Sequence, residues 1–142
     1  MSRLVLLSAA LFFSMHTLAQ TADLAVDGVV YGTKGLPLKG VSVVLRGDQG
    51  STLQQTETRP NGRFSFELSF DLYTEIILSK PGHAPKMLVL DTRNLSDEDK
   101  QYNYEYGGFR ITLEEGDDSI RPKLVARVHF DANLGNFNQQ AP

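Results

Sequence analysis

Alternation of apolar and polar residues is the clearest pattern in this chain, and it predicts β-strands. In residues 63–68, phenylalanine or leucine takes every second position and polar side chains take the others. Side chains of a strand point alternately to opposite faces, so this segment is predicted to be half-buried. Residues 41–45 repeat the pattern with valine and leucine. Runs of this kind, separated by Gly, Pro and Asn, predict strands at residues 24–31, 41–45, 52–58, 63–68, 73–79, 86–90, 108–114 and 123–130.

Two turn motifs predict how these strands are connected. Residues 59–62 (Arg-Pro-Asn-Gly) combine a proline with an Asn-Gly pair that tolerates positive φ, which predicts a hairpin between strands 52–58 and 63–68. Residues 80–82 (Lys-Pro-Gly) carry the pattern of a type II turn. Because short strands without helices cannot cover their apolar faces in one open sheet, two sheets must pack together. The expected fold is all-β, a Greek-key β-sandwich of about seven to eight strands, with a barrel as the alternative.

The first nineteen residues have the pattern of a cleavable export signal. Arg3 is followed by the uncharged apolar run 4–13, and residues 17–19 (Thr-Leu-Ala) place a small residue where a signal peptidase cuts. Ten residues are too few to span a bilayer as a helix, since a helix rises only about 1.5 Å per residue. We therefore expect residues 1–19 to be a signal peptide that is removed before Gln20.

Composition supports one globular domain after this signal. Of 142 residues, 41% are hydrophobic and 22% are charged, a balance typical of a chain with a packed core. We expect residues 20–134 to form the domain and residues 135–142 to be a flexible tail. The formal net charge of −3 argues against a nucleic-acid partner. The absence of cysteine excludes disulfides, thiolate metal sites and a cysteine nucleophile, and no second apolar run is long enough to span a membrane after signal cleavage.

Several short motifs together carry a resemblance to a known family. They are Val26-Asp27-Gly28-Val29-Val30, Gly35-Leu36-Pro37-Leu38-Lys39-Gly40-Val41, Asn61-Gly62-Arg63-Phe64-Ser65-Phe66 and Lys80-Pro81-Gly82. In this combination the sequence resembles the carboxypeptidase regulatory-like domain family, most strongly over residues 24–91. The resemblance implies a transthyretin-like, or prealbumin-like, β-sandwich. Residues 90–94, 107–109 and 124–131 are similar to a subset of exported proteins of Gram-negative envelopes.

The sequence contains no recognised catalytic motif. After the signal, the histidines are His83 and His129, which form no H-E-x-x-H pattern, and the chain has no G-x-S-x-G elbow. The resembled family takes its name from domains appended to metallocarboxypeptidases, and the appended domain itself carries no catalytic zinc ligands. We therefore assign no catalytic, cofactor or metal residue. His83 stands where relatives carry Tyr or Phe, which is either a ring substitution at a loop edge or a ligand or pH-sensing position.

Acidic residues are concentrated between residues 91 and 118, where only three basic residues accompany them. The nine acids are Asp91, Asp97, Glu98, Asp99, Glu105, Glu114, Glu115, Asp117 and Asp118. Oxygen-rich loops can hold calcium, but neither run has the D-x-[DN]-x-[DN]-G spacing of a calcium loop. Solvated loop charge, calcium binding and a surface for a basic partner remain alternatives.

Three tyrosines are the candidate contact residues for a ligand or partner. Tyr102, Tyr104 and Tyr106 alternate with Asn103 and Glu105, so in an extended segment their rings would project from one side. Exposed tyrosines suit sugar or protein binding because each combines apolar area with a hydroxyl group. The alternative is that these rings cover an edge of the sandwich.

The sequence therefore predicts a non-catalytic exported β-sandwich module with a structural or protein-interaction role in the bacterial cell envelope. We expect it in the periplasm or at the cell surface, with an unknown envelope protein or a glycan as partner. One alternative is a carbohydrate-binding module that uses the three tyrosines. Another is a hydrolase with an unrecognised carboxylate pair.

Overall fold

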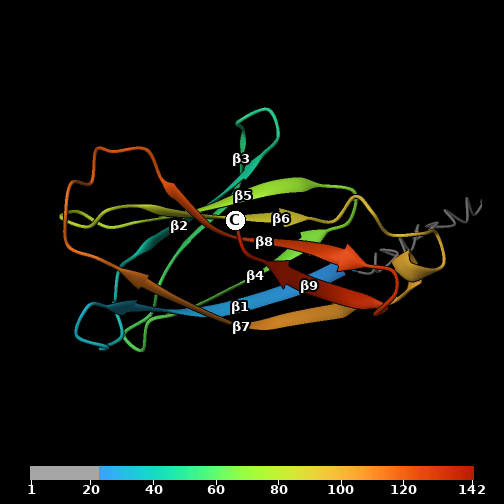
Figure 1. The fold of residues 1–142 in the computed structure, drawn as a ribbon, viewed down its shortest axis with the longest axis horizontal. Helices are drawn as coiled ribbons and strands as arrows, with labels where there is room; N and C mark the ends of the chain where they lie inside the picture. The colour runs from blue at the N-terminus through green and yellow to red at the C-terminus, as the bar shows by residue number, and fades with distance from the viewer. Residues whose placement is uncertain (1–22) are drawn as a thin grey trace, which may run out of the picture.

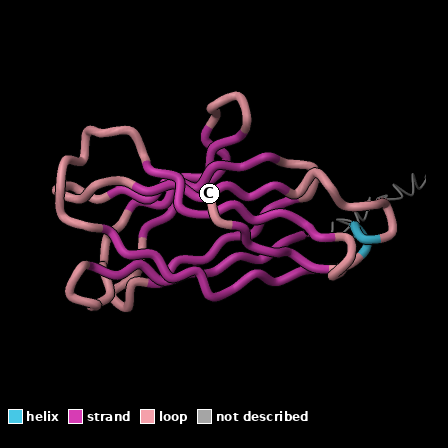
Figure 2. The backbone as a smooth tube through the Cα atoms, in the orientation of Figure 1, coloured by secondary structure: helices cyan, strands magenta, loops and turns pink. Residues whose placement is uncertain are grey.

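The computed structural model describes residues 23–142, which form nine strands and one short 3₁₀ turn (Figures 1 and 2). The predicted signal peptide, residues 1–19, lies outside the described residues. Within residues 23–142, no helix is long and apolar enough to cross a membrane. The elements are β1 (Asp23–Gly32), β2 (Ser42–Gly47), β3 (Thr52–Glu57), β4 (Arg63–Ser69), β5 (Tyr73–Ser79), β6 (Lys86–Asp91), η1 (Asp99–Gln101), β7 (Tyr104–Leu113), β8 (Lys123–Asp131) and β9 (Asn136–Gln140).

The strands form two layers, a small sheet and a large sheet. The small sheet has the order β4-β1-β7, and the large sheet has the order β3-β2-β5-β6-β8-β9. Pairing is antiparallel except for β1 with β7 and β6 with β8, which are parallel. In Figure 1, β1 and β7 of the small sheet run below β5 and β6 of the large sheet. The predicted all-β sandwich is confirmed, with nine strands in place of seven or eight.

The core lies between the sheets and follows the predicted alternation. In β4 the apolar side chains face the large sheet, with Phe64 2% and Phe66 8% exposed, while the residues between them are exposed. Val41, Val43 and Leu45 are fully buried opposite them. Each such side chain contributes roughly 1.5–3 kcal/mol to the free energy of folding by leaving water, so these strands hold the two layers together.

The predicted hairpin at residues 59–62 is wrong in its pairing. The turn itself forms, because the backbone N–H of Arg59 donates to the carbonyl of Arg63 (3.0 Å). However, β3 before it belongs to the large sheet and β4 after it belongs to the small sheet. β3 is polar and largely exposed on both faces, whereas every second side chain of β4 is buried. β4 takes β1 as its antiparallel partner, and its apolar face packs against the large sheet.

The predicted flexible tail contains a strand. Residues 136–140 form β9, which pairs antiparallel with β8. Phe137 is only 6% exposed, and its ring lies edge-on to that of Phe130, with the ring centroids 5.5 Å apart. A single aromatic residue in a polar segment gives no alternation to recognise, and it is this ring that holds the end of the chain against the core.

Two buried threonines connect loops to the strands. The hydroxyl of Thr58 accepts from the backbone N–H of Val41 (2.9 Å) and donates to the carbonyl of Leu38 (2.6 Å). Thr92 accepts from the N–H of Leu72 (3.0 Å) in the same way. A buried backbone group without a partner costs free energy, so each hydroxyl fixes a chain crossing between strands.

Candidate functional site

The structure separates the three candidate tyrosines. Tyr102 follows η1, outside β7, and is 58% exposed. Tyr104 begins β7 and points to the inside, where burial raises the pKa of its hydroxyl. Its ring lies edge-on, with centroid distances of 5.5–5.9 Å, to the rings of Phe70, Phe130 and Phe137.

Tyr106 also points inward, and it links the two sheets at their edge. Its ring lies 4.9 Å from that of Phe109, and its hydroxyl donates to the side-chain oxygen of Gln139 on β9 (3.0 Å). Burial raises the pKa of this hydroxyl as well. Tyr104 and Tyr106 therefore share one side of β7, as the alternation predicts, but this side covers the sandwich edge. Only Tyr102 among the three has an open ring face.

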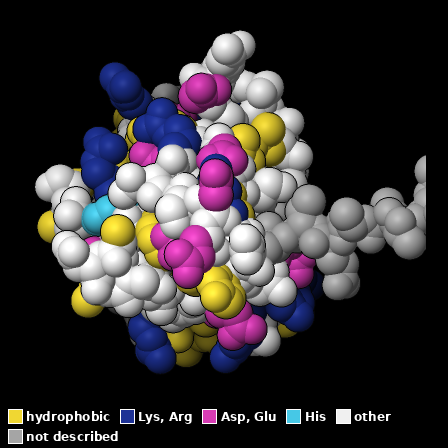
Figure 3. All heavy atoms as spheres, turned by 90° about the vertical axis from the view of Figure 1, so that its right-hand side faces the viewer, with side chains coloured by type: hydrophobic (Ala, Val, Ile, Leu, Met, Phe, Trp, Pro, Cys, Tyr) yellow, Lys and Arg dark blue, Asp and Glu magenta, His cyan; other side chains and the backbone are white. Residues whose placement is uncertain are grey.

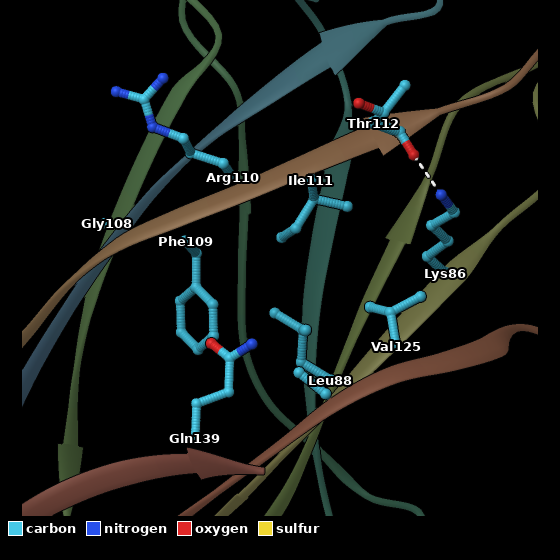
Figure 4. A pocket seen from close by; sticks show the side chains of 10 residues that line it. Lys86, Leu88, Gly108, Phe109, Arg110, Ile111, Thr112, Val125 and Gln139 are labelled. Carbon is cyan, nitrogen blue, oxygen red and sulfur yellow. Dashed lines mark hydrogen bonds between the residues drawn. The ribbon is translucent and has the colours of Figure 1, made fainter. Parts of the chain in front are cut away.

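A cavity of about 290 Å³ lies beside Tyr106, since Phe109 and Gln139, which contact this tyrosine, line it. It occupies the opening between β7 and the facing strands β6, β8 and β9, which we call the seam (Figure 4). Hydrogen bonds cross the seam at both ends, from Tyr106 to Gln139 and from the ammonium of Lys86 to the carbonyl of Thr112. The lining includes Leu88, Phe109, Arg110, Ile111, Val125 and Gln139.

The seam combines apolar side chains with accessible backbone. Figure 4 shows Phe109 and Ile111 pointing from β7 toward Leu88 and Val125, whereas Arg110 points away from the cavity. In the part of the chain that the structure describes, β7 has no strand partner on this side, because it is the last strand of the small sheet. Sequence analysis missed these residues. Their alternation identifies a strand, but nothing in it shows that the strand lies at an edge.

A second, shallower hollow of about 270 Å³ lies on the outer face of the small sheet. There Ala25 on β1 stands directly beside both Glu67 on β4 and Glu105 on β7, and Asp27 is the next outward residue of β1. All three carboxylates are exposed. This is the carboxylate group closest to the hydrolase hypothesis, but it stands on an open sheet face without the enclosing walls of an active site.

The acidic run at residues 114–118 docks on the turn at residues 80–85. The carboxylate of Glu114 pairs with Lys86 (3.0 Å), and this hydrogen-bonded pair lowers the pKa of Glu114. The carboxylate of Asp118 accepts from the backbone N–H of Gly82 (2.8 Å), and His83 forms an isolated bridge with Glu115. These acids therefore fix a loop in place.

The acidic run at residues 97–99 has a similar local role. The hydroxyl of Ser96 donates to the carboxylate of Asp99 (2.7 Å), and Lys100 pairs with Asp71 (2.9 Å). The carboxylate of Asp71 raises the pKa of Lys100. Figure 3 looks onto the η1 end of the sandwich and shows acidic side chains spread among basic and hydrophobic ones. Within residues 23–142, no group of three or more His, Asp or Glu side chains is arranged to hold a metal ion.

The ion pair between Arg93 and Asp91 also has a structural role. The guanidinium of Arg93 binds both carboxylate oxygens of Asp91 (2.9 and 2.8 Å) and lies over the ring of Tyr73. The hydrogen bond from Arg93 lowers the pKa of Asp91. His129 lies next to this group, since Asp91 is its register partner on the neighbouring strand.

No protein-family profile and no curated protein matches this sequence. Among solved structures, it is similar to 3-chlorocatechol 1,2-dioxygenase from Rhodococcus opacus 1CP, with 15% identity, 68% of this chain and 60% of that chain covered, and a TM-score of 0.47. It is also similar to the dioxygenase domain of a dioxygenase carbohydrate-binding protein fusion from Streptomyces sp. SirexAA-E, with 18% identity, 70% and 84% covered, and a TM-score of 0.48.

A third similar structure is the Bacillus anthracis TIE protein, with 11% identity, 67% of this chain and 16% of that chain covered, and a TM-score of 0.45. This chain spans about three fifths of the length of the Rhodococcus enzyme. Likenesses with TM-scores below 0.5 assign neither an activity nor a ligand to this chain.

Proposed function

We propose that this protein is a non-catalytic, exported β-sandwich module with a structural or protein-interaction role in the bacterial cell envelope. The observation that carries the proposal is the seam, where one side of the β7 backbone has no partner strand among residues 23–142 and a cavity lies beside it. This arrangement suits protein binding, because an added strand can hydrogen-bond to the uncovered backbone and place side chains in the cavity. Membership of the carboxypeptidase regulatory-like family is part of the proposal and rests on the motifs of residues 24–91.

Charged groups elsewhere support a non-catalytic role. The pKa values of Asp91, Glu114 and Asp117 are all lowered by hydrogen bonds that hold turns or neighbouring strands. A catalytic acid usually has its pKa raised by burial, the opposite direction. The perturbed carboxylates of the described residues therefore have a structural explanation.

The export part of the proposal is tested by expressing the full chain in a Gram-negative host. We expect the protein in the periplasmic or secreted fraction, with Gln20 as the new N-terminus by mass spectrometry. Arg3→Glu, which removes the positive charge before the apolar run, should slow this processing. Intact, unprocessed chain confined to the cytoplasm would contradict export.

The non-catalytic part is tested with protein purified to homogeneity. We expect no turnover of a panel of generic ester, peptide and glycoside substrates. Turnover that disappears in Glu67→Gln or Glu105→Gln would instead establish the hydrolase with a carboxylate pair.

The carbohydrate-binding alternative now depends on Tyr102, because the rings of Tyr104 and Tyr106 point inward. Binding of a glycan from a broad panel, measured by tyrosine fluorescence and lost in Tyr102→Ala, would favour a carbohydrate-binding module. Tyr31→Ala provides a control in which a tyrosine away from η1 is removed.

A further inference from the structure

β7 carries backbone hydrogen-bonding groups that no strand of residues 23–142 covers. This strand is last in the small sheet, and among the described strands it pairs with β1 alone. The ammonium of Lys86 donates to the carbonyl of Thr112, so this carbonyl points away from β1 and toward the seam (Figure 4). Backbone groups of alternate strand residues point to the same side, so Arg110 also presents its N–H and C=O to the seam. An exposed edge of this kind is a template for another strand.

Side chains along this edge are sorted to two faces. Phe109 and Ile111 are buried and point into the sandwich, whereas Arg110 and Thr112 are exposed on the outer face. A strand added beside β7 would alternate in the same way, because its side chains follow the same pleat. Its inward side chains would enter the cavity beside Val125, and an outward side chain would lie next to Arg110.

The positive charge of Arg110 at the β7 edge favours an acidic residue in the added strand. Arg110 and Arg63 both stand beside Val29, one on each side of β1, so this part of the outer face is basic. Within residues 23–142 the guanidinium of Arg110 makes no salt bridge. Glu105, the acidic residue on the same strand, lies beyond the bulge between Val26 and Gly28 in the β1–β7 register.

This charge pattern disfavours a second copy as the occupant. Two β7 edges that paired antiparallel about Arg110 would place like charges opposite each other, which destabilises a strand pair. A carboxylate opposite Arg110 would stabilise the pair instead. The complementary occupant is therefore an extended segment with apolar residues on one face and an acidic residue on the other.

We infer that the seam binds such a segment of a partner protein by strand addition to β7 between Gly108 and Thr112. Main-chain hydrogen bonds supply affinity, and the shape of the cavity and the charge of Arg110 supply selectivity. An N–H of the added strand takes over the Thr112 carbonyl, which the ammonium of Lys86 occupies in the free protein. This inference rests on the proposed interaction role and names the kind of partner and its binding site.

The test uses a blocked heptapeptide, Val-Thr-Val-Glu-Val-Thr-Val, and its counterpart with Lys in place of Glu. We expect calorimetry to show the acidic peptide binding roughly fivefold tighter than the basic one. Arg110→Glu should reverse this preference. Arg63→Glu is the matched control, because it makes the same charge change on the other side of Val29, and it should leave the preference intact. Hydrogen exchange at the Arg110 amide should slow when the acidic peptide binds.

Three results would overturn the inference. They are no binding of the acidic peptide at about 1 mM, equal effects of the Arg110 and Arg63 variants, and a protein dimer whose formation slows exchange at the same amide. Both variants change exposed side chains, so cooperative unfolding confirms that they remain folded. Failure of the peptide leaves the proposed function standing, because export and the absence of turnover are measured without it.

Discussion

Gly28 shows how a single residue makes room for the side chains of neighbouring strands in the small sheet. It lies in the middle of β1, and a Cβ built there would stand 2.6 Å from the ring of Phe64 and 2.8 Å from the Cβ of Phe109. These two aromatic residues belong to the strands on either side of β1. A glycine in a strand interior usually weakens the strand, and here it makes room for two core side chains.

Gly28→Ala is expected to destabilise the protein by about 1–3 kcal/mol, because the added methyl group forces two packed aromatic side chains to shift. Urea unfolding measures this loss. Gly47→Ala is the control, since its new Cβ would meet nothing closer than 3.5 Å, and it should change stability by less than about 0.5 kcal/mol. Equal losses in the two variants would show that the ring contacts at Gly28 do not limit the packing.

At the residue level, the sequence predicted which side of a strand a side chain occupies better than it predicted which residues that side chain contacts. The inward direction of Phe64 and Phe66 followed from alternation alone, because one face of each strand must leave water. The role of Gly28 did not follow, since a glycine gives no information on what approaches it. Alternation placed Tyr104 and Tyr106 correctly on one side of a strand, but Tyr102 lies outside that strand. No local pattern indicated whether the shared side faces solvent or the core.

Among the elements, β9 depends on one side chain. Four of its five residues are polar, and Phe137 alone reaches the core, where its ring lies 5.6 Å from that of Tyr104. The strand also covers the edge of β8, which would otherwise expose unpaired backbone.

Phe137→Ala is expected to lower the free energy of unfolding by about 3–5 kcal/mol, because it removes a buried ring and leaves a cavity between β8 and β7. Thermal or urea unfolding provides the measurement. Leu134→Ala, in the preceding turn and 65% exposed, serves as the control and should have little effect. A loss below about 1 kcal/mol for Phe137→Ala would indicate that residues 136–140 fray, as the polar composition suggests.

The pairing of elements was the part of the fold that sequence could not supply. Each strand carries its own alternation, so its existence and buried face are local properties. The partner of a strand depends on residues far away in the chain. The turn at residues 59–62 satisfies the local requirements of a hairpin, yet β3 joins the large sheet and β4 pairs with β1. The free edge of β7, and therefore the position of the seam, also depends on which strands pair with one another.

For the whole molecule, acid should weaken the fold. The pKa values of Asp91 and Asp117 lie below their ordinary 3.8, and that of Glu114 lies below its ordinary 4.5. A carboxyl group whose pKa is lower in the folded state binds protons more readily when unfolded. Its contribution to stability is therefore full above the ordinary pKa and is lost as the pH falls through the folded value.

We expect the free energy of unfolding to be nearly constant from about pH 7 to pH 5 and to decrease below about pH 4.5. Urea unfolding at a series of pH values measures the profile. Asp91→Asn should flatten the decrease, because it removes one of the three groups. Glu98→Gln, which changes an exposed acid, should leave the profile unchanged. A decrease of the same size in the Asp91 variant would place the acid sensitivity elsewhere.

The central position of β1 also determines when the small sheet can form during synthesis. In chain order, β1 is the first strand of the small sheet and β7 is the last, and the two strands pair with each other. At their start the backbone N–H of Asp23 donates to the side-chain oxygen of Asn103, 80 positions away in the chain. A ribosome or a translocation pore delivers β1 early and β7 late, so the earliest segment must wait beside unfinished neighbours. Until Leu113 emerges, β1 lacks its neighbour β7, and holding factors that bind such intermediates have their opportunity during that interval.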